Sequence, residues 1–196
     1  MDKQNLLHNF MLFEYEDVKP SKSSDGIITM SGIIQKAGAP NANNRVYPKP
    51  ILEREDKKYQ ELIQDRRALG ELDHPDSPIV QLENVSHLVT ETNWDGNDLV
   101  GTVEVLDTPK GQILEKLIGR DIKLGISSRG LGSTSRTNEG YDMVEDDFSL
   151  VCYDMVSNPS TSGAYMNLQE SREYKTLVNQ NRIVLLDEIL NDILEL

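Results

Sequence analysis

The amino-acid sequence predicts one main α+β domain, dominated by β-strands and carrying two or three helices. The chain has 196 residues, of which 37% are hydrophobic, enough to bury one sizeable core. Runs of β-branched and aromatic residues alternate with loops rich in Gly, Asn and Pro, a pattern typical of antiparallel sheets. Three other segments, 50–68, 109–119 and 180–195, carry apolar residues at helical spacing.

The first third of the chain predicts a terminal peptide, a strand and a helix. Residues 1–26 combine an apolar patch with a polar stretch rich in Lys and Ser, which indicates a peptide followed by a linker. A partly buried strand is expected over 27–34, and a loop over the Asn- and Pro-rich residues 37–47. Two prolines suit the start of the amphipathic helix at 50–68.

Two hairpins and a short helix are predicted in the middle of the chain. Strands over 85–94 and 99–106 flank an Asp-Gly-Asn-Asp turn, a composition common in hairpins. A Thr-Pro pair then supplies an N-cap and a first-turn proline, so a short helix is expected over 109–119. Arms over 122–129 and 141–155, joined by a polar connection, predict the second hairpin.

The acidic composition argues against nucleic-acid and membrane partners. The chain has 33 acidic and 20 basic residues, and a net charge of -13 repels phosphates and anionic membrane surfaces. The apolar stretch at 183–196 is interrupted by polar residues and is too short to span a membrane, and the first residues lack the features of a secretory signal. Cys152 is the only cysteine, which favours a reducing cytosol.

Only three histidines, His8, His74 and His87, are available as bases that titrate near neutral pH. His74 lies in the segment 69–75, where a flanking Gly and Pro favour a loop and two carboxylates are close in sequence. This context suits either a hydrogen-bonded loop residue or a general base. His87 alternates with apolar neighbours in a predicted strand, which indicates a structural or surface position.

The segment 125–133 runs from a predicted strand into a turn with three glycines. Glycines allow close approach of the backbone, and their N–H groups suit an oxyanion, although an ordinary glycine-rich turn has the same composition. The pattern is not the Gly-x-Ser-x-Gly elbow of the α/β-hydrolases, because Arg129 occupies the position of the second glycine.

Three blocks in this order and spacing, 43–48, 68–75 and 125–133, resemble the prohead core proteases of T-even-type tailed phages. The resemblance covers roughly residues 27–160, and the second and third blocks are its most specific parts. That family is related in fold to the herpesvirus assemblins, so the resemblance implies a mostly antiparallel, barrel-like sheet. It also implies a serine endopeptidase that digests scaffold and trims capsid proteins inside the immature head.

The resemblance assigns the chemistry to particular residues. Ser127 matches the family's nucleophile and His74 its catalytic histidine; a serine hydroxyl needs such a base, held in turn by a third group. Asp154, 27 residues after Ser127, matches an acidic position of the family's Asp-x-Val-x-x-Pro-Ser block. Glu71 and Asp73, close to His74, are the alternatives for the third group.

Substrate binding and self-processing are also expected from the resemblance. Backbone N–H groups around Arg129 and Gly130 are the oxyanion candidates. The family cuts after Glu in an aliphatic-x-Glu motif, and Glu14 and Glu170 end such triplets in linker-like surroundings. A substrate carboxylate needs a cationic partner, for which Arg45 or Arg129 is available.

The chain is therefore expected to contain an N-terminal propeptide and linker (1–26), a serine protease domain (27–160), and a polar linker with a C-terminal amphipathic helix (161–196). We expect a self-cleaving zymogen inside the prohead in the host cytoplasm, possessing no cofactor or metal, forming a homo-oligomer or ring, and acting on scaffold or core and major capsid proteins. The alternative is a non-enzymatic assembly protein of related fold. A metal-dependent hydrolase is disfavoured, since His-x-x-x-His and Cys-pair spacings are absent.

Overall fold

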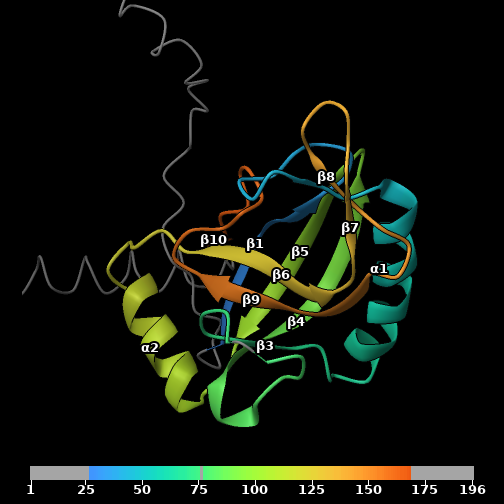
Figure 1. The fold of residues 1–196 in the computed structure, drawn as a ribbon. Helices are drawn as coiled ribbons and strands as arrows, with labels where there is room; N and C mark the ends of the chain where they lie inside the picture. The colour runs from blue at the N-terminus through green and yellow to red at the C-terminus, as the bar shows by residue number, and fades with distance from the viewer. Residues whose placement is uncertain (1–26, 76, 169–196) are drawn as a thin grey trace, which may run out of the picture.

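The computed structural model describes residues 27–75 and 77–168, whose strands form three sheets (Figure 1). The largest sheet has five strands in the order β10-β1-β5-β4-β3, and every pair in it is antiparallel. In that order its strands are Asn167–Leu168, Ile28–Lys36, Asp98–Val105, Val85–Asp95 and Leu69–Glu71.

The other two sheets are smaller. Strands β2 (Arg45–Val46), β8 (Asp142–Val144) and β7 (Thr134–Arg136) form one, in which the β2–β8 pair is parallel. Strands β6 (Gly125–Leu131) and β9 (Ser149–Val156) form an antiparallel pair. The predicted β-dominated, mostly antiparallel α+β fold is confirmed, but the strands of the described residues form separate sheets and no closed barrel.

Within residues 27–75 and 77–168, two α-helices and one short 3-10 turn accompany the sheets. Helix α1 (Lys49–Gln64) ends four residues before the predicted position, because Arg66 takes a left-handed backbone with φ 54°. Helix α2 (Pro109–Ile118) begins as predicted, with the Thr108 hydroxyl accepting a hydrogen bond from the Gly111 N–H at 3.0 Å. The 3-10 turn η1 is Leu82–Asn84. The helix predicted over 180–195 lies outside the described residues.

The two hairpins have different outcomes. The first is confirmed. Strands β4 and β5 pair from Asp95 opposite Asp98, beside the turn, to His87 opposite Val105, and Gly96 supplies the positive φ of 58° that the turn needs. The second is only partly correct. Strands β6 and β9 do pair, but the connection folds as a separate hairpin, β7 and β8, because β8 has its own partner in β2. The predicted arm at 141–155 therefore covers two strands.

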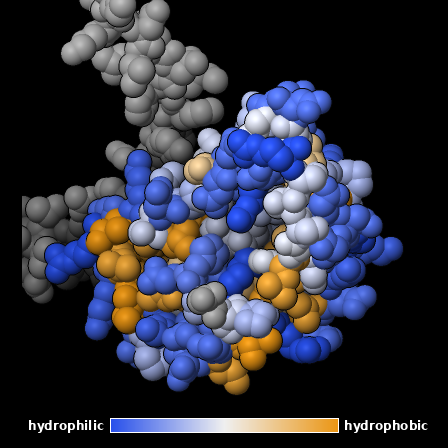
Figure 2. All heavy atoms as spheres, in the orientation of Figure 1, coloured by the Kyte–Doolittle hydropathy of each residue, from blue (hydrophilic) through white to orange (hydrophobic). Residues whose placement is uncertain are grey.

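The main hydrophobic core lies between the five-stranded sheet, the β6–β9 pair and the two helices, which Figure 1 shows at opposite sides of the molecule. Its fully buried members include Val89 and Val103 from the large sheet, Leu114 from α2 and Ile126 from β6. Figure 2 shows a largely hydrophilic surface over the β6–β9 pair and apolar surface near α2 and η1. The core thus fixes the back of β6 and β9 and leaves their polar side chains for the site.

His87 on β4 is part of this interior, so the structural alternative for this residue is correct. The ring is fully buried, and its Nε2 lies 3.1 Å from the Tyr153 carbonyl, which can only accept a hydrogen bond. Nδ1 therefore accepts from the Ser86 hydroxyl at 2.9 Å, and the ring is neutral. Burial lowers the pKa of His87 to about 4.

This pKa predicts a loss of stability in acid. A histidine with a lowered folded-state pKa stabilises the fold fully above its unfolded value of about 6.5, and the contribution is lost as the pH falls toward about 4. Between pH 7.5 and pH 5 the wild type should lose about 2 kcal/mol more unfolding free energy than His87→Gln, measured by urea denaturation. Equal losses in the two proteins would contradict the assignment.

Candidate active site

The site is built on one face of the β6–β9 pair. Ser127 lies opposite Asp154 and Arg129 lies opposite Cys152 in the antiparallel register. Because side chains two residues apart on a strand share a face, these four residues lie on the same face. Ser127 is 4% exposed, and Asp154 and Cys152 are fully buried. Residues from two distant parts of the sequence are thus placed together by strand pairing alone.

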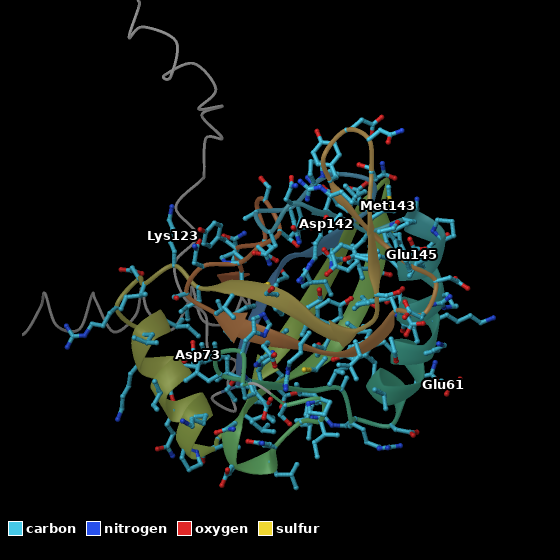
Figure 3. All side chains as sticks on the ribbon, in the orientation of Figure 1. Glu61, Asp73, Lys123, Asp142, Met143 and Glu145 are labelled. Carbon is cyan, nitrogen blue, oxygen red and sulfur yellow. The ribbon has the colours of Figure 1, made fainter. Side chains whose placement is uncertain are left out.

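The segment that carries His74 is attached to the edge of β9. Leu72 forms a parallel bridge with Met155, and the Asp73 N–H donates to the Met155 carbonyl at 2.8 Å. Asp73 has a left-handed backbone with φ 65° and an exposed side chain. Figure 3 labels this residue at the junction, far from Asp142 on β8. The turn at Asp73 directs the chain so that His74 lies next to β9.

Asp154 connects this segment to the strand pair. One carboxylate oxygen, Oδ2, lies 2.8 Å from His74 Nδ1 and accepts from Arg129 Nε at 2.8 Å. The other, Oδ1, accepts from the Glu71 N–H at 3.1 Å and from the Cys152 thiol at 3.2 Å. Burial by itself raises the pKa of Asp154, but the hydrogen bonds from His74 and Arg129 outweigh it and lower the pKa overall.

An ionised Asp154 determines the tautomer of His74. A carboxylate only accepts hydrogen bonds, so the His74 nitrogen that faces it, Nδ1, carries a proton. The neutral ring then has its lone pair on Nε2. With 39% of its side chain exposed, His74 is the accessible end of an otherwise buried pair. This arrangement of imidazole and carboxylate is the one that a general base requires.

Ser127 has a second serine beside it. Within the described part of the chain the Ser127 hydroxyl bonds to the Ser160 hydroxyl at 3.4 Å and makes no hydrogen bond to His74. Ser160 is in turn held by the loop before β2, because the Ala42 N–H donates to its carbonyl at 2.8 Å and Asn41 Nδ2 lies 3.5 Å from its hydroxyl. Sequence reasoning missed Ser160 as a site residue, although it ends the block that singled out Asp154.

The Arg129 side chain is largely buried and binds groups inside the protein. Besides Asp154, its guanidinium bonds to the Glu71 carboxylate, and Nη1 donates to the Ser77 carbonyl at 2.7 Å. Burial lowers the pKa of Arg129, but the hydrogen bond and charge of Asp154 raise it overall, so the side chain stays charged. Glu71, predicted as an alternative partner of His74, is fully buried and contacts Arg129 instead.

The two oxyanion candidates, Arg129 and Gly130, lie on β6. The Ile126 N–H donates to the Ala164 carbonyl at 2.9 Å, on the side of β6 away from β9. The pairing with β9 shifts its register between Arg129 and Gly130, so the strand is irregular at the two candidate residues. Gly130 is required sterically, because a Cβ there would lie 2.5 Å from the Phe148 ring.

The chain is similar to known proteins of one family. Residues 9–176 match the family described as prohead core protein serine protease. The prohead core protein protease of Enterobacteria phage T4 is 38% identical over 151 residues, which cover 75% of this chain and 71% of that protein. The solved structure of the bacteriophage T4 capsid assembly protease, gp21, aligns with a TM-score of 0.64 at 34% identity, covering 75% of this chain and 92% of that one.

A two-strand platform that presents a serine opposite a histidine-bound aspartate is the kind of site found in serine proteases. The chain belongs to the prohead core protein serine protease family. This membership confirms the predicted family and the predicted enzyme class, and it disfavours the non-enzymatic alternative. No helix in the described ranges is long and apolar enough to cross a membrane.

Proposed function

We propose that the protein is a prohead maturation endopeptidase in which Ser127 is the nucleophile, His74 the general base and Asp154 the group that orients His74. The observation that carries the proposal is the 2.8 Å contact between His74 Nδ1 and Asp154 Oδ2, formed by an aspartate that lies opposite Ser127 in the strand register. Herpesvirus-protease-like catalysis on a mostly antiparallel sheet is the form that the family resemblance implies.

The proposed reaction uses these three residues in turn. His74 Nε2 takes the proton of the Ser127 hydroxyl as the oxygen attacks the scissile carbonyl, and a backbone N–H at Arg129 or Gly130 stabilises the oxyanion. His74 then gives the proton to the leaving amine, and water hydrolyses the acyl-enzyme by the same route. Hydrogen bonds between a catalytic serine and its base commonly tighten only when substrate binds, so the present Ser127–Ser160 contact is compatible with this cycle.

Substrates and location follow from the family. The relatives are named for the prohead core and for capsid assembly. The scaffold or core proteins and the major capsid protein are therefore the proposed substrates, cut inside the prohead in the host cytoplasm by a homo-oligomer. No cofactor enters the proposed reaction, because the serine, the imidazole and the carboxylate supply all of its proton transfers.

The nucleophile can be tested against its neighbour. Ser127→Ala should abolish cleavage of a peptide containing Leu-Phe-Glu, a loss on the order of a million-fold for a catalytic serine. Ser128→Ala should retain most activity, because Ser128 faces the other side of β6 and its hydroxyl accepts from Gln35 Nε2 at 2.8 Å. The measurement is kcat/KM for both variants. Retained activity in Ser127→Ala would contradict the assignment of Ser127 as the nucleophile.

Cleavage after Glu requires a cation near Ser127, and Arg45 suits this role better than Arg129. The Arg129 guanidinium already serves Asp154 and Glu71. Arg45 is exposed, and its backbone N–H and carbonyl close a turn with Asn41, in the loop that contacts Ser160. Through Asn41 and Ser160, this turn is connected to Ser127 by two successive contacts.

Arg45→Gln should therefore reduce the preference for Glu over Gln at the cleaved bond by about tenfold or more, as expected for the loss of a charge-assisted hydrogen bond. The measurement is the ratio of kcat/KM for peptides containing Leu-Phe-Glu and Leu-Phe-Gln. Arg136→Gln is the matched control, since Arg136 is an exposed cation of the same small sheet paired with Asp142. An unchanged ratio in Arg45→Gln would contradict the role.

We also infer that residues 1–14 inhibit the enzyme until they are removed. Glu14 and Glu170, the two proposed self-cleavage positions, lie outside the described residues. A tethered Leu-Phe-Glu segment is present at high effective concentration near its own active site and can compete with substrate. Mass spectrometry of purified protein should show loss of residues 1–14 over time in the wild type and an intact chain in Ser127→Ala. Trimming of Glu14→Gln at the wild-type position and rate would refute this inference.

A further inference from the structure

Several ionisable side chains adjoin His74 or belong to the buried cluster that binds it. Asp154 and Glu71 are fully buried carboxylates, and Arg129 is a charged guanidinium with an 11% exposed side chain. Burial and the nearby Asp154 raise the pKa of the Cys152 thiol, so that it stays neutral. The exposed Asp73 adjoins His74 in the chain. With a neutral imidazole, the buried carboxylates and the guanidinium together carry one negative charge.

Arg129 and His74 compete for the same acceptor. Both contact Oδ2 of Asp154, each at 2.8 Å. If Arg129 and Asp154 were the only buried charges, they would cancel, and a protonated His74 would have no net counter-charge. A positive imidazolium at the edge of a buried cluster would then be poorly stabilised.

Glu71 supplies a second buried negative charge, which balances the charge of Arg129, and it does so without contacting the His74 imidazole. Its Oε2 accepts from Arg129 Nη2, and its Oε1 accepts from the Gln81 N–H at 2.7 Å. Both oxygens face donors, as expected for an ionised carboxylate. The Glu71 N–H in turn donates to Asp154 Oδ1 at 3.1 Å. Glu71 therefore acts on Asp154 twice: its backbone holds the Asp154 carboxylate in place, and its side chain balances the Arg129 charge that would otherwise cancel that of Asp154.

We propose that Glu71 is a positioning residue that balances the charge of Arg129, so that the negative charge of Asp154 remains available to the His74 imidazolium formed when Ser127 loses its proton. This inference rests on the proposed function, in which His74 is the base. During proton transfer the buried groups and His74 then pass from a net charge of minus one to zero. Without Glu71 they would pass from zero to plus one, which is less favourable in a buried site.

The titration of His74 reports this charge directly. In the inactive Ser127→Ala background, NMR of the imidazole C–H groups follows the ring, and the His74 signal is assigned by its loss in His74→Gln. Glu71→Gln keeps the side-chain shape and removes the charge, and should move the titration midpoint about one pH unit lower. Arg129→Gln should move it higher, because it removes the competing cation.

The double variant separates electrostatics from a merely structural role. Glu71→Gln combined with Arg129→Gln restores a net charge of minus one to the buried groups, so its midpoint should return at least half of the way to the wild-type value. Damage to the fold would instead add up, and the double variant would deviate most. Glu55→Gln is the matched control: Glu55 is a buried carboxylate on α1 bound by Arg54 and Lys58, and its loss should leave the midpoint unchanged.

Kinetics in the active protein give an independent readout. Glu71→Gln should lower kcat about tenfold on the alkaline plateau with little change in KM, and the deficit should shrink as the pH falls from the wild-type midpoint to the lowered one. An unmoved midpoint in Glu71→Gln, or a double variant further from the wild type than either single variant, would overturn the inference. Cleavage that persists in Ser127→Ala would instead refute the proposed function, whatever the titrations show.

Discussion

A buried aspartate that must remain ionised is the constraint on which the rest of the site depends. Asp154 is removed from water, so its charge is tolerated only because donors from three elements converge on it: His74 after β3, Arg129 from β6 and the backbone of Glu71 at the end of β3. Each donor also fixes its own element relative to β9. The groups that satisfy the carboxylate therefore also assemble the site, and stability and function share the same contacts.

Close backbone packing makes this convergence possible. At Gly70 a Cβ would lie 2.2 Å from both the His87 ring and the Tyr153 carbonyl, so only glycine lets β3 approach β4 and β9 this closely. Glu71, the next residue, is thereby brought within hydrogen-bonding distance of Asp154. His87 in turn bonds to the Tyr153 carbonyl, one residue before Asp154. The acid sensitivity expected from His87 would thus act on the strand that carries the central carboxylate.

The features that the sequence predicted correctly are those that neighbouring residues determine. The Asp-Gly-Asn-Asp turn and the Thr-Pro helix start were correct, because turn and cap preferences depend on adjacent residues. The β7–β8 hairpin was missed because it depends on β2, almost a hundred residues earlier in the chain, whose short parallel pairing has no periodic signal. For the same reason Ser160 escaped notice: its contact with Ser127 is created by the loop at Asn41 and Ala42.

The acidic residue that contacts His74 could not be identified from sequence proximity. The motifs singled out Ser127, His74 and Asp154, with Glu71 and Asp73 as alternatives for the group that holds the imidazole, because sequence proximity does not reveal which way a side chain points. The left-handed turn at Asp73 leaves its side chain exposed, while strand β3 places Glu71 against Arg129. A residue close to a catalytic base in sequence can therefore influence it through a third group, by setting the charge that the base experiences rather than by touching it.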